Sequence, residues 1–106
     1  MLKCSVVFVS SAVEEVPESR LADLMAAGAR FNDAFGSRAV VCFDGRRFFT
    51  YLEGTASSVA ATLVYIESLA IHSELVQLAR GTVQQLRFPE QPLLFMRVTP
   101  SQLKSL

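Results

Sequence analysis

The stretch "FDGRRFFTYLEG", residues 43–54, decides how the chain folds. Asp44-Gly45 is a strong signal for a two-residue β-hairpin turn, because Asp and Gly accept the backbone angles that such a turn requires. The flanking runs "RAVVCF" (38–43) and "RRFFTYL" (46–52) have the composition of strands. Residues 38–52 are therefore predicted to form two antiparallel strands. Thr50, a small hydroxyl among aromatic side chains, is either a polar residue on the outer face of its strand or the remnant of a functional site.

Patterns on either side of the hairpin predict the remaining elements. Apolar residues that recur every three to four positions indicate amphipathic helices, and short β-branched runs indicate buried strands. The predicted elements are helices at 17–35 and 56–71, strands at 2–9, within 74–86 and at 92–98, and a short helix or tail at 100–106.

Residues at the ends of these segments have the chemistry of helix caps and chain turns. Pro17 suits the first turn of a helix, and Gly36 is a natural helix stop. Thr55 has the side chain of an N-cap for the second helix. Gly54 and Gly81 are interpreted as further turn or element ends.

The order of elements is β-α-β-β-α-β, followed by one more strand and a tail. This order is typical of an α+β, ferredoxin-like sandwich in which right-handed crossovers place both helices on one face of the sheet. The other face is expected to be open, or covered by the C-terminal segment and a partner. The length of 106 residues fits a single domain, 1–106.

Composition excludes several classes of partner. Ten basic residues balance ten acidic ones, so the chain has no general attraction for nucleic acid or an anionic membrane, and its neutrality favours self-association. No apolar stretch reaches the roughly 18 residues that span a bilayer, and the N-terminal run is interpreted as a strand rather than a signal peptide. Cys4 and Cys42 match no metal spacing and are typical of buried thiols in a reducing cytosol. We therefore expect a cytoplasmic protein.

A search for catalytic or metal-binding arrangements finds little. His72 is the one histidine, which leaves no basis for a two-histidine metal site or a Ser-His-Asp arrangement. Cys42 and His72 are a weak candidate for a nucleophile pair, and the acidic group at Glu14, Glu15 and Glu18 is interpreted as a solvated loop and helix start. We therefore expect no enzyme activity and no metal site.

At the hairpin the sequence resembles the "Y-x-x-G-x-F-x-Q-x-L-E-G" stretch of BLUF domains, the flavin-binding blue-light sensors. The resemblance extends to "VVFVSSA" (6–12), to Asn32, to "IHS" (71–73) and to "LRFP" (86–89), and it covers about residues 2–96. It implies the same order of elements that the patterns above predict.

The resemblance also implies a cofactor, because BLUF domains hold FAD or FMN between their two helices. In the family, a Tyr on the first strand and a Gln on the third carry the photochemistry. The matching positions are Phe8 and Thr50, which have neither a phenol nor an amide. A basic residue and an Asp of the family are replaced by Ile71 and Leu69. The usual Trp and Met after the "RFP" motif fall on Gln91 and Leu93, or on Met96 after a shift.

Two family positions for flavin binding, Asn32 and His72, remain. Without the resemblance, each is a polar residue at a helix end, and Asn32 would satisfy local carbonyls. The bulky side chains of Leu24, Met25, Phe31 and Phe35 are expected to fill the space between the helices and close the core.

Three hypotheses of function follow. The first is a flavin-free, BLUF-like signalling or regulatory domain that acts by contact with a protein partner or with itself, as a homo-oligomer through the open sheet face. The second is an FAD-binding blue-light sensor with an altered photocycle. The third is an unrelated ferredoxin-like protein, such as a dimeric α+β barrel enzyme.

Overall fold

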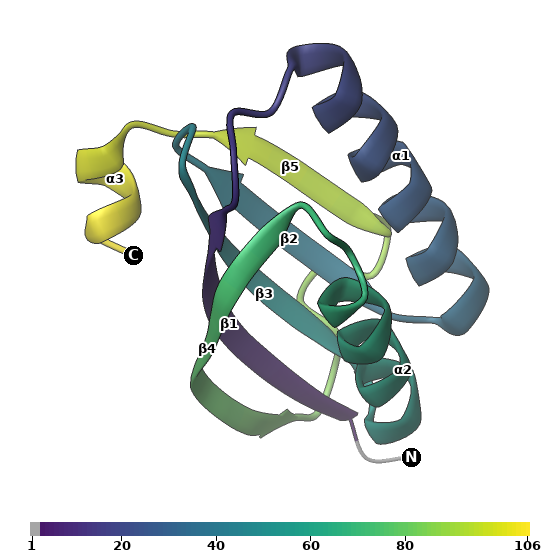
Figure 1. Cartoon of the computed structure of the whole chain (residues 1–106). Coiled ribbons are helices and arrows are strands. Elements are labelled where there is room, and N and C mark those ends of the chain that lie inside the picture. The colour runs from purple at the N-terminus through teal and green to yellow at the C-terminus, as the bar shows by residue number, and fades with distance from the viewer. Residues whose placement is uncertain (1–2) are drawn as a thin grey trace.

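The central strand of the sheet is β3, the second arm of the hairpin (Figure 1). In the computed structural model, which describes residues 3–106, five strands form one sheet in the order β4-β1-β3-β2-β5. β5 runs parallel to β2, and the other neighbouring strands are antiparallel. The strands are β1 (Lys3–Ala12), β2 (Arg38–Phe43), β3 (Arg47–Thr55), β4 (His72–Val83) and β5 (Leu93–Arg97).

Two helices, α1 (Glu18–Phe35) and α2 (Ala56–Glu67), cover one face of the sheet, while the short α3 (Pro100–Lys104) lies on the other side (Figure 1). The crossovers β1-α1-β2 and β3-α2-β4 each skip one strand, because β3 lies between β1 and β2 and β1 lies between β3 and β4. The right-handedness that such crossovers share sets both helices on the same face. The predicted α+β, ferredoxin-like sandwich with an added strand is confirmed. We call the sheet face opposite α1 and α2 the outer face. Among residues 3–106, no helix is long and apolar enough to cross a bilayer.

The predicted caps are present at the helix ends. Gly36 ends α1 in the left-handed conformation, with φ of 80°, and its N–H bonds to the Asn32 carbonyl. The Thr55 hydroxyl accepts a hydrogen bond from the Ser58 amide at the start of α2. Pro17 stands at the N-cap of α1, one residue before its predicted place in the first turn. Local sequence therefore decides where these helices begin and end.

The hairpin turn lies one residue later than predicted. Its two central residues are Gly45 and Arg46, because Asp44 donates its backbone N–H to the Arg47 carbonyl across the turn. The Asp44 carboxylate accepts from the amides of Arg46 and Arg47, at 2.9 and 2.8 Å. Asp44 thus precedes the two central residues of the turn and stabilises it through its side chain. Gly45 supplies the positive φ of 105°.

Other boundaries also differ from the prediction. Helix α2 ends at Glu67 rather than at residue 71, because the chain must turn back to begin β4 at the edge of the sheet. Gly81 lies inside β4, and Gly54 lies inside β3, where a Cβ would meet the Ser58 Oγ at 2.5 Å. Gly54 therefore allows the start of α2 to approach the sheet. The predicted start of the first strand, at residue 2, lies outside the described residues.

A buried carboxylate on the outer face attaches the segment between β4 and β5 to the sheet. Glu53 is fully buried, and its oxygens accept from the backbone amides of Arg87 and Phe88 at 2.9 and 2.8 Å. The Tyr51 hydroxyl also donates to Glu53, at 2.7 Å, and the Tyr51 ring meets the Phe88 ring edge-on. Two backbone donors and one hydroxyl satisfy this carboxylate without a cation.

Burial, followed by the hydrogen bond and charge of Glu53, raises the pKa of Tyr51 from 10.0 to about 12. The folded chain therefore keeps a proton on Tyr51 that the unfolded chain loses near pH 10. We expect the contribution of this group to the free energy of unfolding to be complete below about pH 10 and to be lost between about pH 10 and 12. Urea unfolding across this range measures the loss. In Tyr51→Phe, which has no proton to lose there, the decline should be smaller, and an identical decline in the two proteins would contradict the assignment.

Candidate functional site

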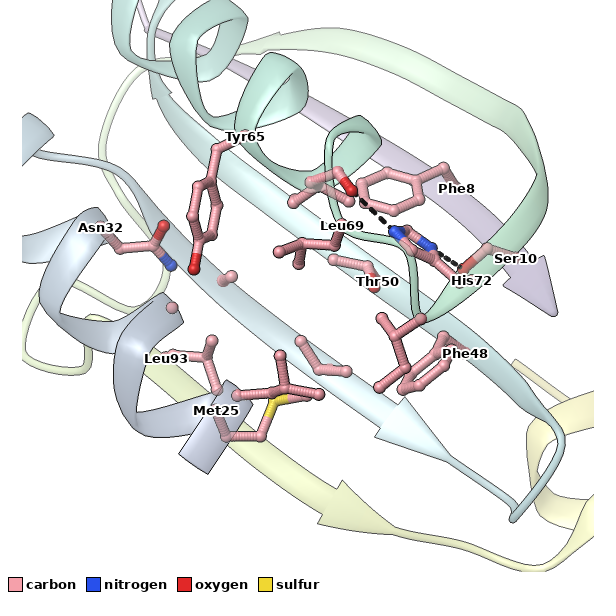
Figure 2. A pocket seen from close by; sticks show the side chains of 16 residues that line it. Phe8, Ser10, Met25, Asn32, Phe48, Thr50, Tyr65, Leu69, His72 and Leu93 are labelled. Carbon is pink, nitrogen blue, oxygen red and sulfur yellow. Dashed lines mark hydrogen bonds between the residues drawn. The ribbon is translucent and has the colours of Figure 1, made fainter. Parts of the chain in front are cut away.

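A cavity lies between α1, α2 and the covered face of the sheet (Figure 2). One apolar cluster contains Leu21 of α1 with Phe43 and Phe48, and a second contains Val59 of α2 with Phe8. The cavity, of about 80 Å³, is bounded by side chains of both clusters. Its lining residues are Phe8, Ser10, Leu24, Met25, Gly28, Asn32, Ala39, Val41, Phe48, Thr50, Tyr65, Ile66, Leu69, Ile71, His72 and Leu93.

Phe8 and Thr50 face each other across the β1–β3 pairing and both line the cavity. Thr50 is only 5% exposed, and it shares its face of β3 with Phe48 and Leu52. The hypothesis that Thr50 lies on the outer face of its strand is therefore wrong. The alternation of β3 instead places Tyr51 on the outer face, where it bonds Glu53.

Asn32 joins the end of α1 to the start of β5. It is 2% exposed, and its Nδ2 donates to the Pro92 carbonyl at 2.8 Å. Its Oδ1 accepts from the Ser37 hydroxyl at 3.2 Å. The interpretation of Asn32 as a helix-end residue is confirmed, but the carbonyl that its side chain satisfies belongs to a distant segment rather than to its own helix. One N–H of the amide remains for another acceptor.

His72 begins β4, and both of its ring nitrogens are engaged. Because a carbonyl can only accept, Nε2 carries the proton that bonds the Ile66 carbonyl at 2.8 Å. In the neutral ring, Nδ1 then accepts from the Ser10 hydroxyl at 2.8 Å (Figure 2). His72 therefore links the last turn of α2 to β1. Leu69 and Ile71, on the connection that leads to it, also line the cavity.

Tyr65 is a cavity residue that the sequence patterns did not identify. It comes from α2 and faces Asn32 of α1 in Figure 2. Its ring stacks on Phe31 with centroids 4.3 Å apart, and Phe31 stacks on Phe35 at 4.5 Å. The sequence could have indicated Tyr65 as a cavity residue, because it directly precedes Ile66, which lies on the predicted apolar face of α2. Tyr65 continues an aromatic stack that bridges the two helices.

The expectation of a fully closed core is wrong, because the four bulky residues of α1 do not fill the space. Leu24 and Met25 line the cavity, but Phe31 packs in the aromatic stack and Phe35 is 53% exposed. Of the residues considered for the family's Trp and Met, Leu93 lines the cavity. Met96 cannot take the place of the family's Met beside the cavity, since it is 41% exposed and pairs with Cys42 on the outer face.

The structure separates the residues of the weak nucleophile hypothesis. Val41 lines the cavity, so Cys42 points to the outer face, away from His72. Burial raises the pKa of the Cys42 thiol, which disfavours the thiolate. Within the described residues, no group of three His, Cys, Asp or Glu side chains is placed to hold a metal ion. Six of the residues that the resemblance identified, Phe8, Asn32, Thr50, Leu69, Ile71 and His72, line the same cavity.

Comparison with known proteins gives a family match and several structural matches. A family model described as "BLUF: Sensors of blue-light using FAD" matches residues 4–93. The dark-state structure of BlrB, a BLUF protein, matches with a TM-score of 0.86 at 19% identity, over 99% of this chain and 78% of BlrB. A bacterial light-regulated adenylyl cyclase matches with a TM-score of 0.85 at 16% identity, over 90% of this chain and 28% of the cyclase.

A third structure, Klebsiella pneumoniae BlrP1 in a complex with manganese and cyclic diGMP, matches with a TM-score of 0.81 at 23% identity, over 90% of this chain and 24% of BlrP1. The chain thus spans about a quarter of the cyclase and of BlrP1. No curated protein sequence matches the chain.

Replacing Asn32 tests its role as a link between α1 and β5. In Asn32→Leu, two hydrogen bonds are lost, although the Pro92 carbonyl keeps the Ala39 amide and the Ser37 hydroxyl keeps Thr62. At about 1 kcal/mol for each bond, we expect a loss of about 2 kcal/mol in the free energy of unfolding. Denaturant titration of the protein without added ligand measures it. Asp33→Leu, next to it on the exposed side of the helix, is the matched control and should change stability by less than about 0.5 kcal/mol. Equal stability of Asn32→Leu and the unchanged protein would contradict the structural role.

Proposed function

The chain belongs to the BLUF family of blue-light sensors that use FAD, and on this basis we propose that it is a signalling domain of the cytoplasm that acts by protein contact, without flavin photochemistry and without enzyme activity of its own. The observation that carries the proposal is the pairing of Phe8 with Thr50 at the centre of the cavity. A phenyl ring has no proton to transfer, and a threonine hydroxyl has no amide whose hydrogen bonds can rearrange. The two family positions that carry the photochemistry are thus side by side and chemically inert.

The size of the cavity also argues against a bound flavin. The cavity measures about 80 Å³, whereas pockets that hold drug-sized ligands measure about 300–1,000 Å³. The three fused rings of a flavin therefore do not fit between α1 and α2 unless side chains of the lining move aside.

The polar groups of the cavity are a second mismatch with a flavin. A flavin ring carries carbonyl and N–H groups along one edge, and burying such a group without a partner costs about 1–3 kcal/mol. Both nitrogens of His72 are engaged within the chain, and one N–H of Asn32 is used by Pro92. The remaining N–H of Asn32 and the hydroxyls of Thr50 and Tyr65 are fewer than the two carbonyls, the N–H and the two ring nitrogens along a flavin edge. As arranged, these residues do not fit the family's cofactor.

The second candidate function is an FAD-binding light sensor with an altered photocycle. Family membership and the position of the cavity favour it, since the cavity lies between the two helices that hold flavin in the family. Asn32 and His72 would then be the residues that contact the ring.

The outer face supports the proposal of protein contact. Pairing across the five strands sets Val76, Val9, Phe49, Cys42 and Met96 in one apolar line, which we call the outer row. Val76 and Met96, at its two ends, are 52% and 41% exposed. Between them Val9 and Phe49 are half-buried and Cys42 is buried. Contiguous apolar residues that include exposed members are typical of interaction surfaces. We propose a second copy of this chain as the partner, because the zero net charge offers no electrostatic selection of a different one and no charge repulsion between copies.

The absorption spectrum of the purified protein tests the absence of flavin. We expect a colourless preparation that takes up no FAD on titration followed by gel filtration. The double variant Phe8→Tyr with Thr50→Gln, which restores the family's residues at both positions, should also show no light-induced spectral change, because the cavity stays too small. Flavin absorbance in the purified protein, or saturable uptake of FAD, would contradict the proposal and support the sensor.

The role of the outer row is tested by Val76→Lys. A lysine at this exposed position should abolish or strongly weaken self-association, since it places a charge on an apolar contact, while changing monomer stability by less than about 0.5 kcal/mol. Sedimentation equilibrium measures the association. Val64→Lys is the matched control, because Val64 is 69% exposed but belongs to α2 on the opposite face. A monomeric unchanged protein, or equal weakening by both variants, would argue against the outer row.

A further inference from the structure

We propose that the cavity binds a small, uncharged, apolar molecule, about the size of one aromatic ring or smaller. The inference rests on the proposed function, because it concerns what the family's flavin position accepts when no flavin is held there. The cavity, of about 80 Å³, is a space that the packing of α1 and α2 over the sheet leaves unfilled.

The first argument is the chemistry of the cavity wall. Phe8 and Phe48 from the sheet, Leu24 and Met25 from α1, and Leu69 after α2 present only carbon and sulfur. Among the polar side chains of the lining, His72 bonds Ser10 and Ile66 (Figure 2), and Asn32 bonds Pro92. The hydroxyls of Thr50 and Tyr65 are the other polar side-chain groups of the lining. The wall is therefore complementary to a ligand that has an apolar surface and forms very few hydrogen bonds.

The second argument is that water is a poor occupant. A buried water is held by two to four polar partners. Three candidates are in this lining, the hydroxyls of Thr50 and Tyr65 and the remaining N–H of Asn32, and they come from three different elements, β3, α2 and α1. An apolar molecule gains from displacing weakly held water, because its burial removes apolar surface from solvent.

The third argument is access and adaptability. The sheet side of the cavity is closed by buried residues such as Phe8 and Thr50, whereas Met25 and Tyr65, on the helix side, are half-buried. The cavity therefore meets solvent between the helices. Met25 has an unbranched side chain with three rotatable bonds, which lets it adjust to the shape of a ligand.

The chain supplies its own spectroscopic probe and internal control. Met25 lines the cavity, and Met96 is exposed on the outer face. With methionine methyl groups labelled with ¹³C, and signals assigned by Met25→Leu and Met96→Leu, benzene can be titrated into the full chain. We expect the aromatic ring current of benzene to shift the Met25 methyl signal in a saturable way and to leave the Met96 signal nearly unchanged.

Two variants reduce the cavity and one preserves it. Thr50→Leu adds bulk at the centre, and Gly28→Ala places a Cβ only 3.0 Å from the Cδ1 of Leu93, another lining residue. Both should weaken the benzene-dependent shift at least several-fold, and Gly28→Ala still tests the inference if Thr50→Leu fails to fold. Thr50→Val keeps the shape without the hydroxyl and should retain the shift. Thermal unfolding of each variant verifies that it is folded.

Titration of FAD into the same labelled protein distinguishes failure of this inference from failure of the proposed function. A saturable benzene shift at Met25 without FAD uptake supports the inference. A missing or unsaturable shift, or equal shifts at Met25 and Met96, without FAD uptake, overturns the inference and leaves the proposed function standing. Uptake of FAD that displaces benzene overturns the proposed function, and this inference with it.

Discussion

The register between β1 and β3 is the constraint on which the rest of the structure depends. Phe8 stands opposite Thr50, and this single alignment decides which side chain of every neighbouring pair points toward the helices. Because side chains alternate along a strand, a slip of one residue would send Tyr51 and Glu53 into the core and Thr50 to the outer face. The native register instead gives Glu53 the amides of Arg87 and Phe88, which fasten the segment that leads to β5.

Polar residues around the cavity form hydrogen bonds that connect separate elements of the fold. Asn32 connects α1 to the segment before β5, and His72 connects α2 to β1 through Ser10. These bonds hold both helices over the sheet while leaving the space between them apolar. This member of the BLUF family thus keeps the fold and a cavity between its two helices, and its Asn32 and His72 bond other parts of the chain.

Most of the fold could be predicted because its determinants are local. Gly36, Thr55 and Pro17 mark helix ends through backbone angles and caps that depend on a few neighbouring residues, and alternation or amphipathic spacing marks the elements between them. The errors have tertiary causes. Gly54 lies within β3 because α2 approaches it, and α2 ends early because His72 must reach Ile66 and Ser10. The hairpin turn lies one residue later than predicted because the strand register places Asp44 opposite Arg47.

By itself, the sequence determined the order of elements, the fold class and the residues that replace a phenol and an amide, Phe8 and Thr50. Those properties follow from residue identity and short-range periodicity. Only the tertiary structure decided that Thr50 points inward, that a cavity remains beside it and that Tyr65 reaches into its wall. Side-chain direction depends on register, and empty space depends on how two helices rest on a sheet. Both are set by contacts between residues far apart in the chain, which no local pattern records.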